Sequence, residues 1–204
     1  MADVVVIDSG GANLASLLYA LQRLGSKATV SNDAARIRAA SHVLLPGVGA
    51  ANDAMTRLRA AGVDSLLPTL TQPVLGICLG MQMLFEASEE AAAGATETRC
   101  LGVVPGRVRR MQAAPGLPVP HMGWNQLEPL QDDPLFDGIA RGDYVYFVHS
   151  YAAPVGEYTL AAADYGGRFT AAVKRNNFRG VQFHPERSAA VGARLLGNFL
   201  SIRG

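Results

Sequence analysis

The stretch Val74-Leu75-Gly76-Ile77-Cys78-Leu79-Gly80 decides how this chain folds. A short apolar run ends at a cysteine with a glycine two residues to either side, and an apolar stretch of helical character, residues 79–88, follows directly. This is the Gly-x-nucleophile-x-Gly pattern, in which the nucleophile lies on a sharp turn between a buried strand and a helix. Such a turn leaves no room for side chains at the glycine positions. The N-terminal N–H groups of the following helix would favour the thiolate of Cys78.

The N-terminal half on both sides of this stretch alternates between strands and helices. Apolar and β-branched runs predict strands at residues 4–7, 27–30, 42–45 and 74–77, and apolar spacing predicts helices at 13–24, about 50–60, 63–70 and 79–88. Strands that alternate with helices form parallel sheets with right-handed crossovers. This half therefore predicts an α/β fold built on a parallel sheet.

The second half changes character, because Gly, Pro and β-branched residues replace the helical spacing. It predicts mostly antiparallel strands at residues 107–111, 124–127, 144–148, 158–160, 171–173 and 180–183, and a closing helix over 188–202 with Ser188 as its N-cap. We expect an α/β mixed central sheet that is parallel in the N-terminal half and antiparallel in the C-terminal half, with helices on both faces. No linker divides the chain, so we expect one domain over residues 1–204.

Length and composition exclude several classes of protein. The 204 residues carry a formal net charge of +1, which argues against a nucleic-acid-binding protein, and 49% hydrophobic residues argue against disorder. Two cysteines, Cys78 and Cys100, do not make a disulfide framework or a zinc ribbon. The sequence has no apolar run of transmembrane length and no signal-peptide pattern, so we expect a reducing, cytoplasmic location.

A cysteine nucleophile needs a base, and the sequence offers His184. It lies in Gln182-Phe183-His184-Pro185-Glu186, at the end of a predicted strand. In an extended segment, residues two apart share a face, so Glu186 can orient the imidazole.

Acyl transfer also needs oxyanion donors. The backbone N–H of Leu79 is one candidate, and the turn Pro46-Gly47-Val48-Gly49 is the other, because carboxyl ends of parallel strands share one edge of the sheet.

Residues 76–82 together with residues 184–186 resemble the class I (triad) glutamine amidotransferases, which have a flavodoxin-like fold. Four further segments, residues 45–49, 120–125, 146–151 and 184–188, resemble one branch of that family, the separate glutaminase subunits of histidine biosynthesis. The resemblance covers essentially the whole chain. It implies that Cys78 attacks the side-chain amide of glutamine, that His184 moves the proton, that Glu186 orients His184, and that a thioester is hydrolysed to glutamate. It implies no cofactor and no metal.

The resemblance also implies roles for residues around the triad. Gln82 and Glu90 would contact bound glutamine, the latter at the α-amino group, and backbone groups near His149, Ser150 and Tyr151 would hold its α-carboxylate end. Gly47, Val48 and Gly49 would supply a switchable oxyanion donor beside Leu79.

The family passes its ammonia to a partner, a (β/α)8-barrel cyclase, with which it forms a heterodimer. Four residues would lie near that interface: Asn13, His121, Trp124 and Arg187. For His121 and Trp124, the sequence favours a buried pair on a strand equally well.

Some positions depart from the family pattern, and other functions remain open. Ser9 and Ala12 differ in the first loop, Ala51 replaces a common Phe, and Arg187 replaces a common Lys. These departures concern partner contacts rather than the triad. The alternatives are the glutaminase of another triad amidotransferase, a non-catalytic module that keeps the fold, and a cysteine peptidase or esterase with the same turn.

Overall fold

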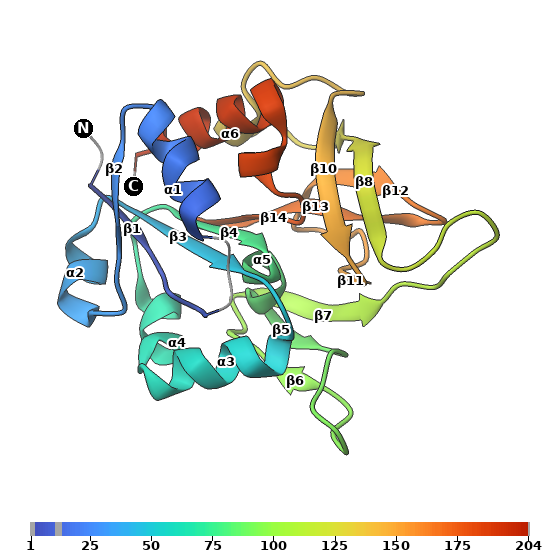
Figure 1. Ribbon diagram of the computed structural model, residues 1–204, viewed down its shortest axis with the longest axis horizontal. Coiled ribbons are helices and arrows are strands. Elements are labelled where there is room, and N and C mark those ends of the chain that lie inside the picture. Colours follow the sequence, from blue (N-terminus) through green and yellow to red (C-terminus); the bar gives the residue numbers. More distant parts are fainter. Residues whose placement is uncertain (1–2, 11–13, 204) are drawn as a thin grey trace.

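A long mixed sheet forms the centre of the molecule (Figure 1). The computed structural model describes residues 3–10 and 14–203. Within them, eight strands are ordered β2-β1-β3-β4-β14-β13-β12-β9. The strands from β2 to β14 in that order are parallel, and β13, β12 and β9 continue antiparallel. Their bounds are β1 Asp3–Val6, β2 Lys27–Val30, β3 His42–Gly47, β4 Val74–Cys78, β9 Glu128–Pro129, β12 Thr159–Asp164, β13 Arg168–Arg175 and β14 Phe178–Val181.

The inner parallel strands β1, β3 and β4 are mostly apolar because both faces of this part of the sheet are buried. In β1, Val4 and Val6 pack into one hydrophobic cluster, and Val5 packs into a second cluster on the opposite face. The same alternation places Leu44 in the first cluster and Val43 in the second. Successive side chains of a strand point to opposite faces, so a continuous apolar run supplies both clusters.

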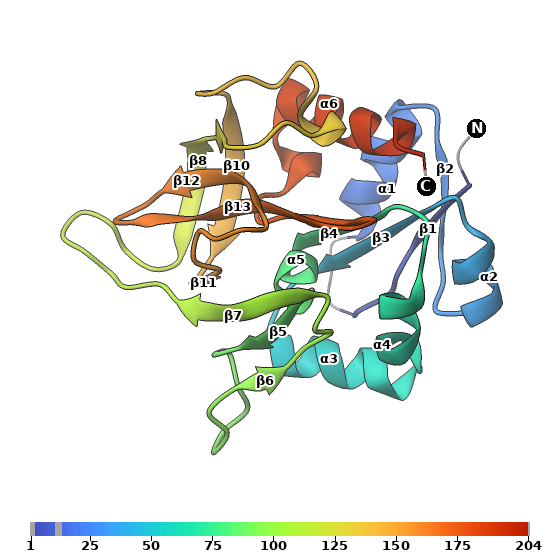
Figure 2. The same ribbon diagram turned by 180° about the vertical axis from the view of Figure 1, so that it is seen from behind.

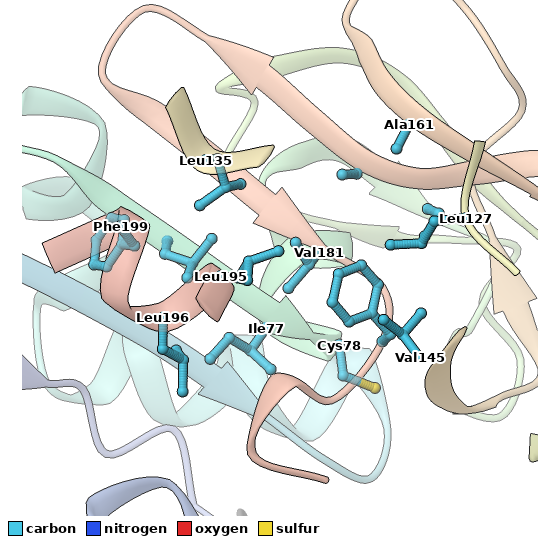
Figure 3. Packing of buried hydrophobic residues seen from close by; sticks show 14 of the residues in the cluster. Ile77, Cys78, Leu127, Leu135, Val145, Ala161, Val181, Leu195, Leu196 and Phe199 are labelled. Atoms are coloured by element: carbon cyan, nitrogen blue, oxygen red, sulfur yellow. The ribbon is translucent and has the colours of Figure 1, made fainter. Parts of the chain in front are cut away.

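Helices cover each face of the sheet. α1 (Leu14–Arg23) and α6 (Ala189–Ser201) lie side by side on one face, and α2 (Ala34–Ala39), α3 (Ala51–Ala60) and α4 (Val63–Leu66) lie on the other (Figures 1 and 2). Figure 3 shows Leu195, Leu196 and Phe199 of α6 packed over Ile77 and Val181 of the central strands. The short helix α5 (Leu79–Met83) follows β4 directly. The described residues also contain the single 3₁₀ turns η1 (Leu67–Thr69), η2 (Pro134–Phe136) and η3 (Pro185–Arg187).

Two smaller sheets extend the central one. β8 (His121–Gln126) and β10 (Tyr144–His149) form an antiparallel pair, in which His121 lies opposite His149. The other sheet has the order β11-β7-β5-β6, with β5 (Phe85–Ser88), β6 (Thr98–Arg99), β7 (Val104–Arg110) and β11 (Tyr151–Ala152). The chain therefore passes from β10 in one small sheet to β11 in the other at Ser150, next to the carboxyl edge of the central sheet.

The expected fold class is confirmed, with corrections of detail. The helix predicted over 79–88 ends at Met83, because the backbone of residues 85–88 pairs with β6 and β7 instead. The structure also contains helix α2, which was not predicted from the sequence. One strand of the C-terminal half, β14, runs parallel to β4. Ser188 does precede α6, but its hydroxyl donates to the His184 carbonyl and accepts from the Tyr146 N–H rather than capping the helix.

We predict that Gly80→Ala prevents stable folding, whereas Gly197→Ala is tolerated. A Cβ at Gly80 would lie 1.6 Å from the Leu45 carbonyl oxygen, while one at Gly197 meets nothing closer than 4.0 Å. We expect Gly80→Ala to lower the free energy of unfolding by about 3 kcal/mol or more, and Gly197→Ala to leave it unchanged or raise it by up to about 1 kcal/mol. Urea denaturation followed by circular dichroism measures both, and equal stabilities of the two variants would contradict the close approach.

Candidate active site

Cys78 occupies a strained turn between β4 and α5. Its φ of 53° and ψ of −112° lie outside the regions that most residues adopt, and its carbonyl-side neighbour Leu79 begins the helix. A Cβ at Gly76 would lie 2.7 Å from the Gly80 carbonyl oxygen, so both glycines of the predicted pattern are required by contact. The turn stores backbone strain and holds the sulfur at the sheet edge.

The sulfur opens onto a pocket of about 410 Å³. Cys78 itself is 7% exposed, and its Sγ lies 3.8 Å from both the Val148 carbonyl oxygen and Nε2 of Gln182. Figure 3 shows Cys78 directly after Ile77 at the end of its strand, among residues of the hydrophobic cluster. The pocket is lined by every residue predicted for catalysis, glutamine binding and the oxyanion site, namely Gly47, Val48, Gly49, Cys78, Leu79, Gln82, Glu90, His149, Ser150, Tyr151, His184 and Glu186.

His184 and Glu186 form a buried pair at the carboxyl end of β14. His184 Nδ1 lies 2.8 Å from Glu186 Oε1, and the 3₁₀ turn η3 places both on the pocket. Because a carboxylate accepts only, Nδ1 of His184 carries a proton whether the ring is neutral or charged. Nε2 is buried and makes no hydrogen bond to any described residue. Burial alone would lower the pKa of His184, but the Cys78 sulfur and the Glu186 carboxylate outweigh it and raise this pKa to about 10.

A pair of buried amides supports the floor of the pocket. Gln82 Nε2 donates to the Tyr151 carbonyl and to Gln182 Oε1, both at 2.9 Å. The second bond leaves Nε2 of Gln182 facing the Cys78 sulfur. Gln182 was not singled out from the sequence. It lies two residues before His184 on the same extended segment, and residues two apart share a face. Gln82 is engaged by the protein here, with its amide nitrogen turned toward the Tyr151 segment.

Hydrogen bonds hold both ends of the turn between β3 and α3. Ser9 Oγ donates to the Pro46 carbonyl at 2.6 Å, and Glu90 Oε2 accepts from the Ala51 N–H at 2.9 Å. Gly49 between them has a φ of 86°. Two departures from the family pattern, Ser9 and Ala51, thus contact the predicted oxyanion turn. Burial raises the pKa of Glu90, and the Ala51 N–H partly offsets this.

The four residues predicted for a partner interface have different environments. Asn13 lies outside the described residues. On β8, Trp124 is 52% exposed while His121 is 2% exposed, because residues three apart on a strand point to opposite faces. His121 is therefore buried in the core of this chain, and its place near a partner interface stays a prediction. The guanidinium of Arg187 lies 4.5 Å from the centre of the Tyr146 ring and lines the pocket.

The described part of the chain offers neither a metal site nor a membrane span. Across residues 3–10 and 14–203, no group of three or more His, Cys, Asp or Glu side chains is arranged to hold a metal ion. The helices in the same residues are too short or too polar to cross a bilayer.

Comparisons with known proteins agree with this geometry. The family model described as glutamine amidotransferase class-I matches residues 5–202. The chain therefore belongs to the class I glutamine amidotransferase family.

Relatives within that family narrow the assignment. The imidazole glycerol phosphate synthase subunit HisH of Shewanella oneidensis is 52% identical, over 98% of this chain and 96% of that relative. The protein of the same name from Xanthomonas axonopodis pv. citri is 54% identical, over 99% and 98% of the two chains. The chain belongs to this HisH group, the glutaminase subunits of imidazole glycerol phosphate synthase, as the motifs at residues 120–125 and 146–151 predicted.

Solved structures show the fold at much lower identity. PurLQS from Thermotoga maritima matches with a TM-score of 0.72 and 18% identity, over 98% of this chain and 98% of the matched one. The glutaminase domain of a Trypanosoma brucei CTPS, solved with bound acivicin, matches with a TM-score of 0.67 and 14% identity, over 98% and 94%.

We predict that Cys78→Ala and Glu186→Gln each lower the pKa of His184. A raised pKa keeps the imidazole protonated through neutral pH, and the Cys78 sulfur and the Glu186 carboxylate are the two groups that raise it. Without either group, burial has more weight, so the ring loses its proton at distinctly lower pH. An NMR titration of the histidine rings measures this, with His42 as an internal control remote from the pocket. Identical titration of His184 in all three proteins would contradict the coupling.

Proposed function

We propose that Cys78, His184 and Glu186 hydrolyse L-glutamine to glutamate and ammonia, as the glutaminase step of imidazole glycerol phosphate synthase in histidine biosynthesis. One observation carries the proposal: a cysteine on a strained strand–helix turn shares a pocket with a histidine whose Nδ1 is fixed by a carboxylate at 2.8 Å. A nucleophile, a base and a group that orients the base are the parts of a triad.

In the first half of the reaction, the sulfur of Cys78 attacks the side-chain carbonyl carbon of glutamine. The new S–C bond forms a tetrahedral intermediate, and His184 holds the proton that the thiol gives up. His184 then protonates the amide nitrogen, the C–N bond breaks, and ammonia leaves behind a thioester. The negative oxygen needs N–H donors during this step. The backbone of Leu79 and the turn at Gly47, Val48 and Gly49 line the same pocket and support that role.

In the second half, water replaces ammonia. His184 accepts a proton from the water as its oxygen attacks the thioester carbon, and the S–C bond breaks to release glutamate. The thiol proton is restored from His184. Glu186 keeps Nδ1 protonated throughout, so Nε2 is the nitrogen that exchanges protons.

The pocket offers groups of suitable charge for the amino-acid end of glutamine. We assign Glu90 to the α-amino group, since its carboxylate lines the pocket. Backbone groups of His149, Ser150 and Tyr151 are assigned to the α-carboxylate end, and Gln82 contacts the bound ligand from the helix after the nucleophile. The side chain of His149 takes no part in this contact, because both of its ring nitrogens bind other protein groups.

Ammonia released here serves a partner cyclase, which we propose is a (β/α)8 barrel that makes imidazole glycerol phosphate and aminoimidazole carboxamide ribotide. Free ammonia is mostly protonated at neutral pH and then is not nucleophilic, so a closed passage has a chemical reason. Met122, Trp124 and Tyr144 on β8 and β10 are each more than half exposed. Exposed aromatic and apolar side chains of this kind support a protein interface here. Trp124 and Arg187 are assigned to it, in a heterodimer.

We predict that Cys78→Ala abolishes glutamine hydrolysis and that the cyclase with its ligand raises the wild-type rate. Removal of the sulfur removes thioester formation altogether, and Gly49 allows the oxyanion turn to reorient at little cost. Steady-state glutaminase assays with and without the cyclase test both points. A glutamine-like electrophile should modify Cys78 alone in mass spectrometry. Equal rates with and without the cyclase would contradict coupling, and residual hydrolysis by Cys78→Ala would contradict the triad.

We predict that Glu90→Gln raises the KM for glutamine while kcat changes little. A neutral amide removes the charge that faces the α-amino group, and loss of a charge-assisted hydrogen bond costs about 1.5–3 kcal/mol, or roughly 10- to 100-fold in KM. Glu89→Gln is the matched control, since Glu89 Oε2 accepts from the Arg110 backbone away from the pocket. An unchanged KM in Glu90→Gln would remove Glu90 from the binding site.

A further inference from the structure

We propose that His121 and His149 are positioning residues: a buried, neutral histidine pair whose hydrogen bonds hold the Tyr151 carbonyl and thereby the glutamine pocket. The inference rests on the proposed function, because it concerns the pocket in which glutamine would bind. The two rings lie opposite each other on β8 and β10, with His121 Nδ1 3.0 Å from His149 Nε2.

One end of this pair is anchored by an acceptor. His149 Nδ1 lies 2.9 Å from the Tyr151 carbonyl oxygen, which can only accept. Nδ1 of His149 must therefore carry a proton. In a neutral ring, Nε2 is then an acceptor, so the proton between the two rings belongs to Nδ1 of His121.

The other end is anchored by a donor. Asn125 Oδ1 accepts from the Gln126 N–H at 2.8 Å, and Asn125 Nδ2 donates to the Asp164 carbonyl at 2.7 Å. These two bonds fix the orientation of the amide, so the group 3.4 Å from His121 Nε2 is the NH₂. His121 Nε2 is thus an acceptor, and Nδ1 carries the ring's proton. Together the two ends require one arrangement, in which both rings are neutral and protonated on Nδ1.

The surroundings hold the rings in this state. His121 and His149 are 2% and 6% exposed. His121 is stacked on Tyr165 and Phe147, with ring centres 4.0 and 4.9 Å away, so its plane is fixed. Burial lowers the pKa of His121 to about 4 and that of His149 to about 3, which agrees with neutral rings.

The pair acts on the pocket through Tyr151. Its carbonyl accepts from His149 and also from Gln82 Nε2, and Gln82 in turn donates to Gln182, whose amide faces the Cys78 sulfur. The hydrogen bonds therefore run without a gap from Asn125 to the nucleophile. Residues 149–151 join β10 to β11 and line the pocket, so loss of the His149 bond frees the segment that holds the ligand.

The proton arrangement can be tested on the wild-type protein by NMR, without an activity assay. Long-range ¹H–¹⁵N NMR spectra of the full chain distinguish the protonated from the unprotonated ring nitrogens. We expect His121 and His149 both to carry a proton on Nδ1 alone between pH 6 and pH 8. A ring protonated on Nε2, or charged in this range, would overturn the proposal. This result does not depend on whether the chain hydrolyses glutamine.

Paired variants test the effect on the pocket. His149→Asn can keep an N–H near the position of Nδ1, whereas His149→Phe removes it. With the cyclase present, we expect KM for glutamine to rise roughly tenfold in His149→Phe and clearly less in His149→Asn, because one buried hydrogen bond is lost or kept. The rate of Cys78 alkylation by iodoacetamide should stay within about twofold of wild type in both, since the triad itself is intact.

His42→Phe is the matched control, because His42 is also a buried histidine but lies at the amino end of β3, bonded to the Ile202 carbonyl. It should lower stability and leave KM unchanged. Equal KM values for His149→Phe and wild type, or equal increases in His149→Phe and His42→Phe, would overturn the positioning role. A wild-type chain that fails to hydrolyse glutamine with the cyclase would instead refute the proposed function.

Discussion

The contact between the backbone of Gly80 and the Leu45 carbonyl is the constraint on which the rest of this structure depends. It brings the start of α5 directly onto the end of β3, so that the turn at Cys78 and the turn after Pro46 lie against each other. A Cβ at Gly47 would lie 3.1 Å from the Gly80 nitrogen, which shows how closely the two turns pack. The proposed nucleophile and the proposed oxyanion donors therefore share one edge because of backbone packing, before any side chain contributes.

Within that framework, the site combines burial with charge. Burial opposes a charged imidazole, yet His184 lies between a sulfur and a carboxylate that stabilise its proton. The opposite environment surrounds His121 and His149, where burial is the largest influence and lowers the pKa of both rings. His149 and His184 line this pocket and His121 lies behind His149, and these three buried histidines differ in protonation because their partners differ. We assign proton exchange with the substrate to His184, whereas the neutral pair holds fixed hydrogen-bond directions.

Local sequence predicted those features that depend on contacts within a few residues. The parallel strands follow from short apolar runs, and the turn at Cys78 follows from two glycines at fixed spacing. The prediction of a helix up to Ser88 was wrong, because the backbone of residues 85–88 pairs with strand β7, about 20 residues further along the chain. Gln182 was missed because its role exists only once β14 lies beside β4. The alternative of a buried pair at His121 and Trp124 is wrong for Trp124, since residues three apart on a strand point to opposite faces.

The oxyanion turn shows how a fixed framework can still leave one peptide free to move. Ser9 fixes the Pro46 carbonyl, and Glu90 fixes the Ala51 N–H at the start of α3. The segment between these anchors contains Gly49, whose positive φ is accessible to glycine at no steric cost. Val48 and Gly49 lie between β3 and α3 and belong to neither element, so a peptide there can rotate without removing a residue from the sheet or the helix. Because Glu90 also lines the pocket, its hydrogen bond to Ala51 joins the proposed binding site for the amino-acid end of glutamine to the anchor of the turn. The same carboxylate therefore belongs both to the pocket and to the anchor of the proposed oxyanion turn.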